Sequence, residues 1–299
     1  MLLTRDEMRF DFGGHKLDPV RDRDTIAWAV QQFLFGEVTG IQVGHWIYQA
    51  PDLESARFLS KQALEEFQHV GNFLRILEIL GVPPGPAHPL LRHLTAISST
   101  WEEHVALEMA VGEGLVLQAF YAMIELVDHE EITSILKRGV RQEEGHVDFG
   151  ERRTMRAIEG RPWLRRRLLG LAIVNLWAIR RFARFMEKRL PAHPAAAQLP
   201  AFLAHIVGAA ETRLLRMGVL DRPFAKLSTK GRALLVVEAY AGKAGSAALS
   251  LVTWPFRLLP WFSAKRLTDT YLDDPEVKRV GALAEHAGET EEPEHVGAE

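Results

Sequence analysis

The same pattern of carboxylates and histidine occurs twice in this chain, and it constrains the fold more than any other sequence feature. His69 follows Glu66, and His146 follows Glu143, each at Glu-x-x-His spacing in a segment with helical periodicity. Residues three apart lie on neighbouring turns of one helix face, so a carboxylate and an imidazole can reach one point in space. Surface pairs of this kind are common, so the context of the two motifs decides their meaning.

Each motif follows a lone glutamate in an almost uncharged helical segment. Glu37 lies in FGEVTG and precedes Glu66, and Glu113 lies in VGEGLV and precedes Glu143 at almost the same separation along the chain. The separation between the two lone glutamates also nearly equals the separation between the two motif histidines. The sequence therefore predicts two copies of one helical hairpin, each bearing Glu … Glu-x-x-His.

Apolar residues recur at three- and four-residue spacing along most of the chain, and no convincing β-strand pattern occurs. Helices are predicted at residues 25–49, 52–80, 98–127, 130–159, 162–190 and 195–218. Long consecutive helices favour an all-α four-helix bundle with additional C-terminal helices. We expect four parts: an N-terminal segment (1–24), the bundle with its two further helices (25–220), an apolar helical extension (221–283) and an acidic, disordered tail (284–299).

Composition narrows the classes of function. The chain has no cysteine, which excludes disulfides, thiolate nucleophiles, iron–sulfur clusters and Cys-based zinc sites. A net charge of −3 gives no reason to expect nucleic-acid binding. The start MLLTRDEMRF lacks a long apolar region, so we expect a cytoplasmic protein without a signal peptide.

Residues 232–263 are apolar and carry tryptophans, and helix 162–190 is strongly basic. The apolar segment could cover the bundle or make a peripheral membrane contact, and the basic helix could be a solvated face or could meet an acidic partner or an anionic membrane. A homodimer is also compatible with the sequence.

Four glutamates inside a bundle would be costly to ionise without compensation. Two divalent cations would balance four carboxylates, and mixed carboxylate and imidazole donors suit iron or manganese. One glutamate from each of two helices, with Glu-x-x-His from each of the other two, is the arrangement of di-iron and di-manganese sites in helical bundles.

The sequence resembles the ferritin-like di-iron carboxylate superfamily over roughly residues 25–220. The segments FGEVTG, EEFQHVGNF, VGEGLVLQAFYAM and QEEGHVDFGERR carry this resemblance. Within the superfamily the chain is most similar to aldehyde-deformylating oxygenases and R2-like ligand-binding oxidases. The resemblance implies a ferritin-like four-helix bundle, two iron ions or a mixed Mn/Fe pair, and six metal ligands: Glu37, Glu66, His69, Glu113, Glu143 and His146.

Several positions depart from individual members. Phe73 stands where the ribonucleotide reductase small subunit has its radical tyrosine, and Glu108 stands where the ligand-binding oxidases have a crosslinked tyrosine. Gly139 replaces the third histidine of the arylamine oxygenases. Gln142 replaces a common aspartate that would bind a ligand histidine, while Glu65 occupies the matching place in the other hairpin. Some hydrogen-bond partner for each histidine is still expected.

The resemblance implies an O2-activating oxidase or oxygenase that acts on a small, lipophilic organic substrate. An external electron donor, of the ferredoxin or reductase type, would then be needed, since no flavin, nicotinamide or iron–sulfur motif is present. One alternative is a ferroxidase or peroxide-scavenging protein of the ferritin or rubrerythrin kind. Another is a helical structural or membrane-associated protein without metal, which would leave the repeated ligand pattern to chance.

Secondary candidates lie on the same helices. Tyr121, eight positions after Glu113, is either a core tyrosine, a hydrogen-bond donor behind the metal ligands or a redox group. Five glycines beside the glutamates either pack helices closely or leave a cavity near the metals: Gly36, Gly40, Gly44, Gly112 and Gly114. His45, His104 and Glu108 are expected on ordinary helix faces.

Overall fold

The computed structural model describes residues 1–40, 44–85, 98–187 and 194–253. Across these ranges the chain is helical between its loops and forms no strand; one isolated bridge joins Leu17 to Val127. The all-α class expected from the sequence is therefore confirmed. The acidic tail and the later part of the apolar extension, residues 254–299, lie outside the described residues.

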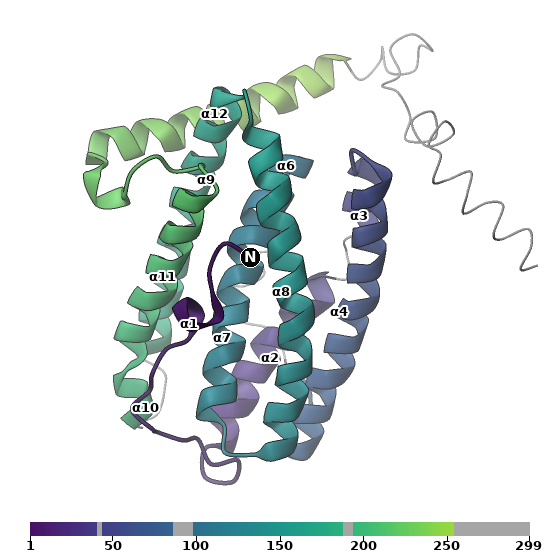
Figure 1. Cartoon of the computed structure of the whole chain (residues 1–299), viewed down its shortest axis with the longest axis vertical. Helices are drawn as coiled ribbons and strands as arrows, with labels where there is room; N and C mark the ends of the chain where they lie inside the picture. The colour runs from purple at the N-terminus through teal and green to yellow at the C-terminus, as the bar shows by residue number, and fades with distance from the viewer. Residues whose placement is uncertain (41–43, 86–97, 188–193, 254–299) are drawn as a thin grey trace, which may run out of the picture.

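Four long helical elements run side by side along the molecule (Figure 1). They are α2 (Arg23–Gly40), α4 (Leu53–Ile79), the continuous run of α6 (Trp101–Glu103), η2 (His104–Glu113) and α7 (Gly114–Leu126), and α8 (Glu130–Ile158). α2 packs on α4, and α8 packs on η2, α7 and α4. These four elements bring the two hairpins of the sequence pattern into one core.

The ends of α4 and α8 agree with the sequence because local signals fix them. The Asp52 carboxylate accepts a hydrogen bond from the Ser55 backbone N–H at 2.8 Å, which caps α4. The same carboxylate accepts a hydrogen bond from Arg153 of α8 at 2.7 Å, so the cap also ties the two helices together. Gly160, with a φ of +64°, lies beyond the end of α8 in a conformation that favours glycine.

Most of the helix expected over 25–49 is present as α2 and α3 (Gly44–Gln49), and residues 41–43 between them lie outside the described residues. One expected helix differs in the structure. The helix expected at 195–218 is divided into α10 (Pro194–Ala197) and α11 (Leu199–Arg216). A proline in the first turn of α11 explains its start, because proline needs no backbone donor there.

No sequence signal predicted that η2 would be a π-helix, in which ten residues are wound more widely than in an α-helix. α8 approaches this wide segment at Gly150, where a Cβ atom would lie 2.7 Å from the Ala110 nitrogen and 2.8 Å from the Val105 oxygen. Glu113 is the last residue of η2. The π-helix therefore sets the rotation at which this glutamate enters the core.

A second layer packs on one side of the four elements. α9 (Pro162–Glu187) and α11 pack against each other, and both contact η2. Arg213 of α11 is fully buried, and its Nε donates to Glu151 of α8 at 2.7 Å. The backbone N–H of Leu2 donates to the other Glu151 oxygen at 2.7 Å, which fixes the N-terminal segment to α8.

α12 (Thr229–Thr253) lies across one end of the bundle, at the top of Figure 1. It crosses α9 at Gly170, where a Cβ atom would lie 2.2 Å from the Leu235 carbonyl oxygen. Three ion pairs hold this end together: Arg166–Glu238 at 2.8 Å, Arg167–Glu103 at 2.6 Å and Lys243–Glu103 at 3.0 Å. Part of the basic charge of α9 is thus paired within the protein.

Candidate metal centre

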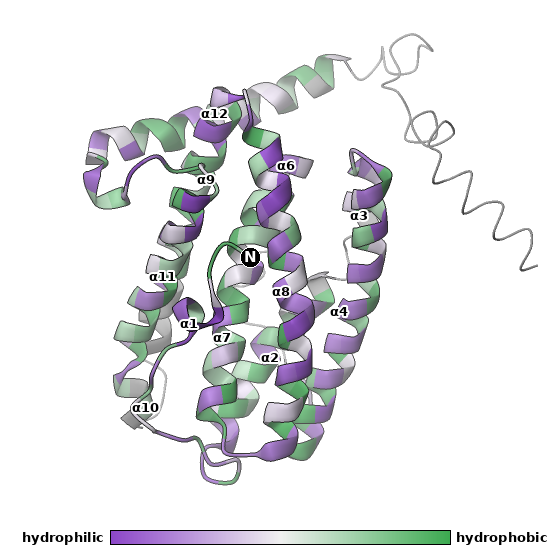
Figure 2. Cartoon of the chain, viewed as in Figure 1, coloured by the Kyte–Doolittle hydropathy of each residue, from purple (hydrophilic) through white to green (hydrophobic). Residues whose placement is uncertain are grey.

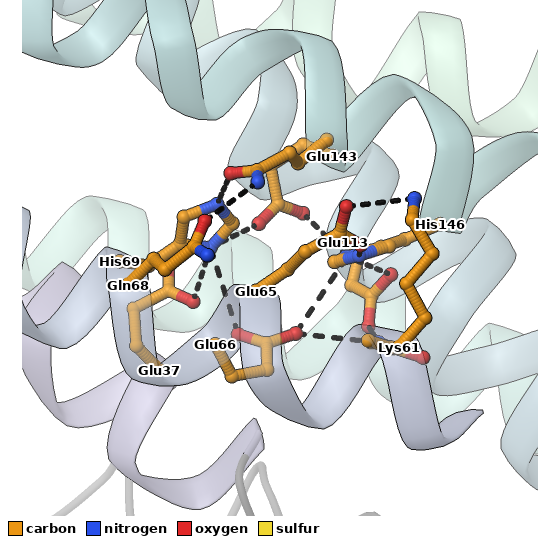
Figure 3. Close-up of polar contacts among 11 residues, drawn as sticks. Glu37, Lys61, Glu65, Glu66, Gln68, His69, Glu113, Glu143 and His146 are labelled. Carbon is orange, nitrogen blue, oxygen red and sulfur yellow. Dashed lines mark hydrogen bonds and ion pairs between the residues drawn. The ribbon is translucent and has the colours of Figure 1, made fainter. Parts of the chain in front are cut away.

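All four long elements direct carboxylates or histidines to one interior region (Figure 3). The structure brings together the six residues that the sequence singled out: Glu37 from α2, Glu66 and His69 from α4, Glu113 from η2, and Glu143 and His146 from α8. The side chain of Glu113 is 23 % exposed, whereas the other five are at most 6 % exposed. The region is therefore buried, and Glu113 is the most exposed of the six side chains.

The six residues form two groups that could each hold a metal ion, and both groups contain Glu66. The first group is Glu37, Glu66, His69 and Glu143, and the second is Glu66, Glu113 and His146. Within each group, one donor atom from every residue lies within 4.8 Å of the others.

Glu66 and Glu143 each direct one carboxylate oxygen toward either histidine. Glu66 Oε2 lies 3.7 Å from His69 Nδ1, and Glu66 Oε1 lies 3.6 Å from His146 Nδ1. Glu143 Oε1 lies 3.1 Å from His69 Nδ1, and Glu143 Oε2 lies 3.6 Å from His146 Nδ1. Glu66, which belongs to both groups, is therefore placed to bridge two cations, and Glu143 of the first group directs its other oxygen toward the second.

Glu37 and Glu113 occupy the two ends of this arrangement. Glu37 Oε2 lies 3.2 Å from His69 Nδ1, and Glu113 Oε2 lies 3.8 Å from His146 Nδ1. Each is thus placed as a terminal donor to one group, while Glu66 and Glu143 lie between the two imidazoles.

The outer nitrogen of each histidine has a partner on the opposite helix. Nε2 of His69 in α4 donates to Gln142 Oε1 of α8 at 2.8 Å. Nε2 of His146 in α8 donates to Glu65 Oε2 of α4 at 3.0 Å, and Lys61 pairs with the other Glu65 oxygen at 2.8 Å. Both Nδ1 atoms are thereby directed inward. The expectation of a partner for each histidine holds, although one partner is a neutral amide.

Gln62 was missed in the sequence and belongs to the centre. Its Nε2 donates to Glu113 Oε1 at 2.9 Å and to Glu66 Oε1 at 3.3 Å. It precedes Glu66 by four positions on α4, so helical spacing alone places it on the same face. It joins one bridging and one terminal carboxylate.

Without a cation, burial and mutual contacts shift the pKa values of the carboxyls and imidazoles in this core. Burial raises the pKa of Glu37, and burial also raises the pKa of Glu113. Burial opposes the charge on Glu143, but His146 and His69 outweigh it and lower the pKa of that carboxyl to about 2. Burial likewise opposes charge on His69 and His146, yet the surrounding carboxylates raise the pKa of both.

The donor set fits divalent iron or manganese. His146 Nδ1 and Glu113 Oε2 are buried atoms without a hydrogen-bond partner, and both point into the second group. A cation there would satisfy both atoms and would replace the protons held by the carboxylates and imidazoles. Mixed oxygen and nitrogen donors suit iron and manganese better than magnesium or calcium.

The unequal outer partners predict unequal affinities of the two groups. Glu65→Gln would give His146 the neutral partner that His69 already has, and should weaken binding of one ion about 10- to 100-fold. Titration of metal-free protein with Mn²⁺ against a coloured chelator measures this change. Glu78→Gln, on an exposed part of the same helix, is the matched control. Identical binding curves for Glu65→Gln and wild type would contradict the role of Glu65.

Tyr121 makes its hydrogen bond away from the six residues. Its hydroxyl donates to Glu144, which also pairs with Arg5 at 2.6 Å. Burial raises the pKa of this phenol. The contacts given by the structure thus place Tyr121 in a link between the N-terminal segment and α8.

The glycines next to the glutamates have different surroundings. A Cβ atom at Gly40 would lie 2.9 Å from the Glu66 carboxylate, so this glycine makes room for a metal-site side chain. At Gly114 a Cβ atom would lie 2.1 Å from Arg213 Nη1, so the space there is filled by a guanidinium. A Cβ atom at Gly112 would meet the Leu107 carbonyl at 3.1 Å, whereas Gly36 faces open space.

The other polar candidates make contacts outside the six-residue centre. His104 Nδ1 pairs with Glu108 at 2.6 Å, and the His104 ring stacks on Trp46 with centroids 4.5 Å apart. His45 contacts Gln49 at 2.7 Å in an exposed position. These contacts lie on helix faces, as the sequence predicted.

A small cavity adjoins His69. Its volume is about 10 Å³. Its lining is mostly apolar: His69, Asn72, Phe73, Phe120, Ile135, Leu136 and Gly139. A space of this size holds about one water-sized molecule.

The fold and this centre define a class: an all-helical protein with buried carboxylate and histidine clusters that could hold metal ions. A scan against protein-family models found no matching model, and searches of the curated proteins and of the solved structures found no match.

Proposed function

We propose that this chain is a ferritin-like protein that binds two iron ions, or a manganese–iron pair, and activates O2 to oxidise a small, lipophilic organic substrate. The observation that carries the proposal is the position of Glu66 and Glu143, each with one oxygen toward His69 and one toward His146. An external electron donor of the ferredoxin or reductase type would supply reducing equivalents.

Two reduced ions held by the six residues would supply electrons for the reduction of O2. The protein's own groups prepare this position. The four carboxylates balance the charge of two divalent ions, and the outer hydrogen bonds from Nε2 leave each Nδ1 lone pair directed inward. The buried side chains around His69 keep bulk water away from this position, and Glu113 is the most exposed of the six side chains.

A ferroxidase or peroxide-scavenging function is the second candidate, and the size of the cavity favours it. About 10 Å³ beside His69 admits a molecule as small as water or peroxide, but an organic substrate would require neighbouring side chains to move. The two candidates therefore differ in what must reach the metals.

The fate of iron and O2 distinguishes the candidates. Anaerobic protein is loaded with Fe²⁺ and exposed to O2, while O2 uptake and the amount of iron retained are measured. For the oxygenase we expect iron to stay near two ions per chain, with uptake resuming when a reductant and an organic substrate are added. Oxidation of a large excess of Fe²⁺ into a mineral would replace the oxygenase by the ferroxidase.

Filling the cavity provides a structural test. A Cβ atom at Gly139 would lie 3.8 Å from His69 and from Phe120, so Gly139→Val would project into the cavity without direct displacement of a glutamate. We expect slower O2 uptake, by about tenfold or more, at unchanged metal content. Gly145→Val is the matched control, because Gly145 lies on the same helix and faces open space. Equal rates in both variants would exclude this cavity as the route.

A further inference from the structure

α12 exposes apolar side chains over most of its length. Figure 2 shows this helix at the end of the bundle, and its exposed large apolar residues are Leu234 (54 %), Val237 (64 %), Tyr240 (47 %), Leu249 (64 %), Leu251 (77 %) and Val252 (67 %). Two described helices are long and apolar enough to cross a membrane. Trp101–Leu126 is 61 % buried in the core, whereas Thr229–Thr253 is only 12 % buried.

The outer face of α12 is unusually apolar for a surface helix. Leu235 and Ala239 are buried against α9, and Lys243 turns toward the bundle to pair with Glu103 at 3.0 Å. No charged residue follows between 244 and 253. A surface helix normally turns its charges outward. The outer face of α12 is therefore built to meet an apolar phase.

The charges and tryptophans in the sequence around α12 indicate what kind of apolar surroundings the helix meets. Residues 239–268 contain no aspartate or glutamate and four cations: Lys243, Arg257, Lys265 and Arg266. The same stretch carries Trp254 and Trp261, and Trp is typical of membrane–water interfaces. Lys243 is paired with Glu103, and the other three cations, in a chain with a net charge of −3, make this stretch complementary to anionic lipid. Two copies of this segment would repel each other.

We propose that α12 is a membrane-docking helix that lies in the plane of an anionic bilayer with its apolar face in the lipid. Its crossing of α9 and the Lys243–Glu103 pair hold it across the bundle end, so it lies on the membrane rather than through it. Trp163, 57 % exposed, lies one turn before Arg166, which pairs with α12, and adds an interfacial side chain at this end. The proposal is independent of the metal centre.

Vesicle flotation of the full chain tests the proposal. Wild type should float with phosphatidylcholine vesicles that contain phosphatidylglycerol, less with phosphatidylcholine alone, and less at high salt. The double variant Val237→Glu with Leu249→Glu should weaken partition about a hundredfold, since two apolar side chains leave the lipid. Val20→Glu is the matched control, because Val20 is 87 % exposed in the loop before α2.

A labelled cysteine keeps the test independent of the glutamate variants. The chain has no cysteine, so Leu249→Cys accepts one environment-sensitive dye. Its emission should shift to the blue on vesicles, whereas a dye at Val20→Cys should not respond. Failure of wild type to float would overturn the proposal. So would a dimer that the glutamates dissociate without any vesicle binding, because a second copy would then cover the helix.

Discussion

The variant Glu143→Gln should lose both metal ions during purification, whereas Glu113→Gln should lose one. Glu143 directs one oxygen toward either histidine, at 3.1 Å from His69 Nδ1 and 3.6 Å from His146 Nδ1. Replacing it removes an oxygen donor from the first group and the negative charge that faces His146 of the second. Glu113 belongs to the second group alone, so its replacement leaves the first group intact. Elemental analysis after exhaustive dialysis should give about two ions for wild type, about one for Glu113→Gln and close to none for Glu143→Gln.

The neighbouring glutamate supplies the control for this experiment. Glu144→Gln changes the same residue type one position along α8, but Glu144 is paired with Arg5 and Tyr121 rather than with the centre. It should keep both ions. If Glu143→Gln retained as much metal as Glu144→Gln, the role of Glu143 and the two-ion centre would both be wrong.

The sequence could predict the six convergent residues because helical spacing is nearly a fixed geometry. A Glu-x-x-His motif determines one helix face, and two hairpins with matching internal distances place four faces around a common axis. The ends of α4 were also readable, since Asp52 caps its first turn. What spacing determines is which face of a helix a residue occupies.

Sequence reasoning could not predict features that depend on how two helices meet. The residue types of η2 do not distinguish a π-helix from an α-helix. The close approach of Gly150 to Ala110 becomes visible only in three dimensions. Glu65 and Gln142, the crossed partners that each bind the histidine of the opposite helix, also depend on how far α4 and α8 are shifted along each other. Gly114 was expected to leave space or to pack helices closely, but Arg213 from the distant helix α11 fills that space.

The crossed partners make the centre asymmetric although its six potential ligands are arranged nearly symmetrically. His146 is backed by a carboxylate that Lys61 holds at 2.8 Å, and His69 is backed by a neutral amide. The more exposed terminal carboxylate, Glu113, lies on the His146 side. The group that contains His146 therefore has the charged outer partner and also contains the most exposed side chain. This difference favours loading of the two positions one after the other.

Removal of metal should leave a protein that loses stability as pH rises. In the metal-free protein, the folded-state pKa values of Glu37 and Glu113 are raised by burial. A raised folded pKa favours folding below the unfolded value of the carboxyl, about 4.3, and this contribution is lost as pH rises. His69 and His146, also raised, add a further loss above their unfolded value of about 6.5. Each such group lowers stability by up to about 1.4 kcal/mol per pH unit while it titrates.

Two carboxyls, Glu65 and Glu143, change the stability in the opposite direction at low pH. Hydrogen bonding by His146 and Lys61 lowers the pKa of Glu65 to about 2, although burial opposes this, and Glu143 has a pKa of about 2 as well. Their contribution is present above the unfolded carboxyl value and is lost as pH falls toward 2. The chelated protein should therefore be most stable near the unfolded carboxyl pKa and should weaken steadily toward alkaline pH.

Metal binding would displace the protons on the histidines and on Glu37 and Glu113, so its contribution to stability should grow with pH. Melting temperatures of loaded and chelated protein should be similar near pH 5 and should separate by about 10 °C or more at pH 8. The double variant Glu37→Gln with Glu113→Gln provides the control, because amides do not titrate and its chelated form should show a flatter pH dependence. Equal melting temperatures of chelated wild type at pH 5 and pH 8 would mean that these carboxyls and imidazoles do not share a dry core, and the metal centre would lose its physical basis.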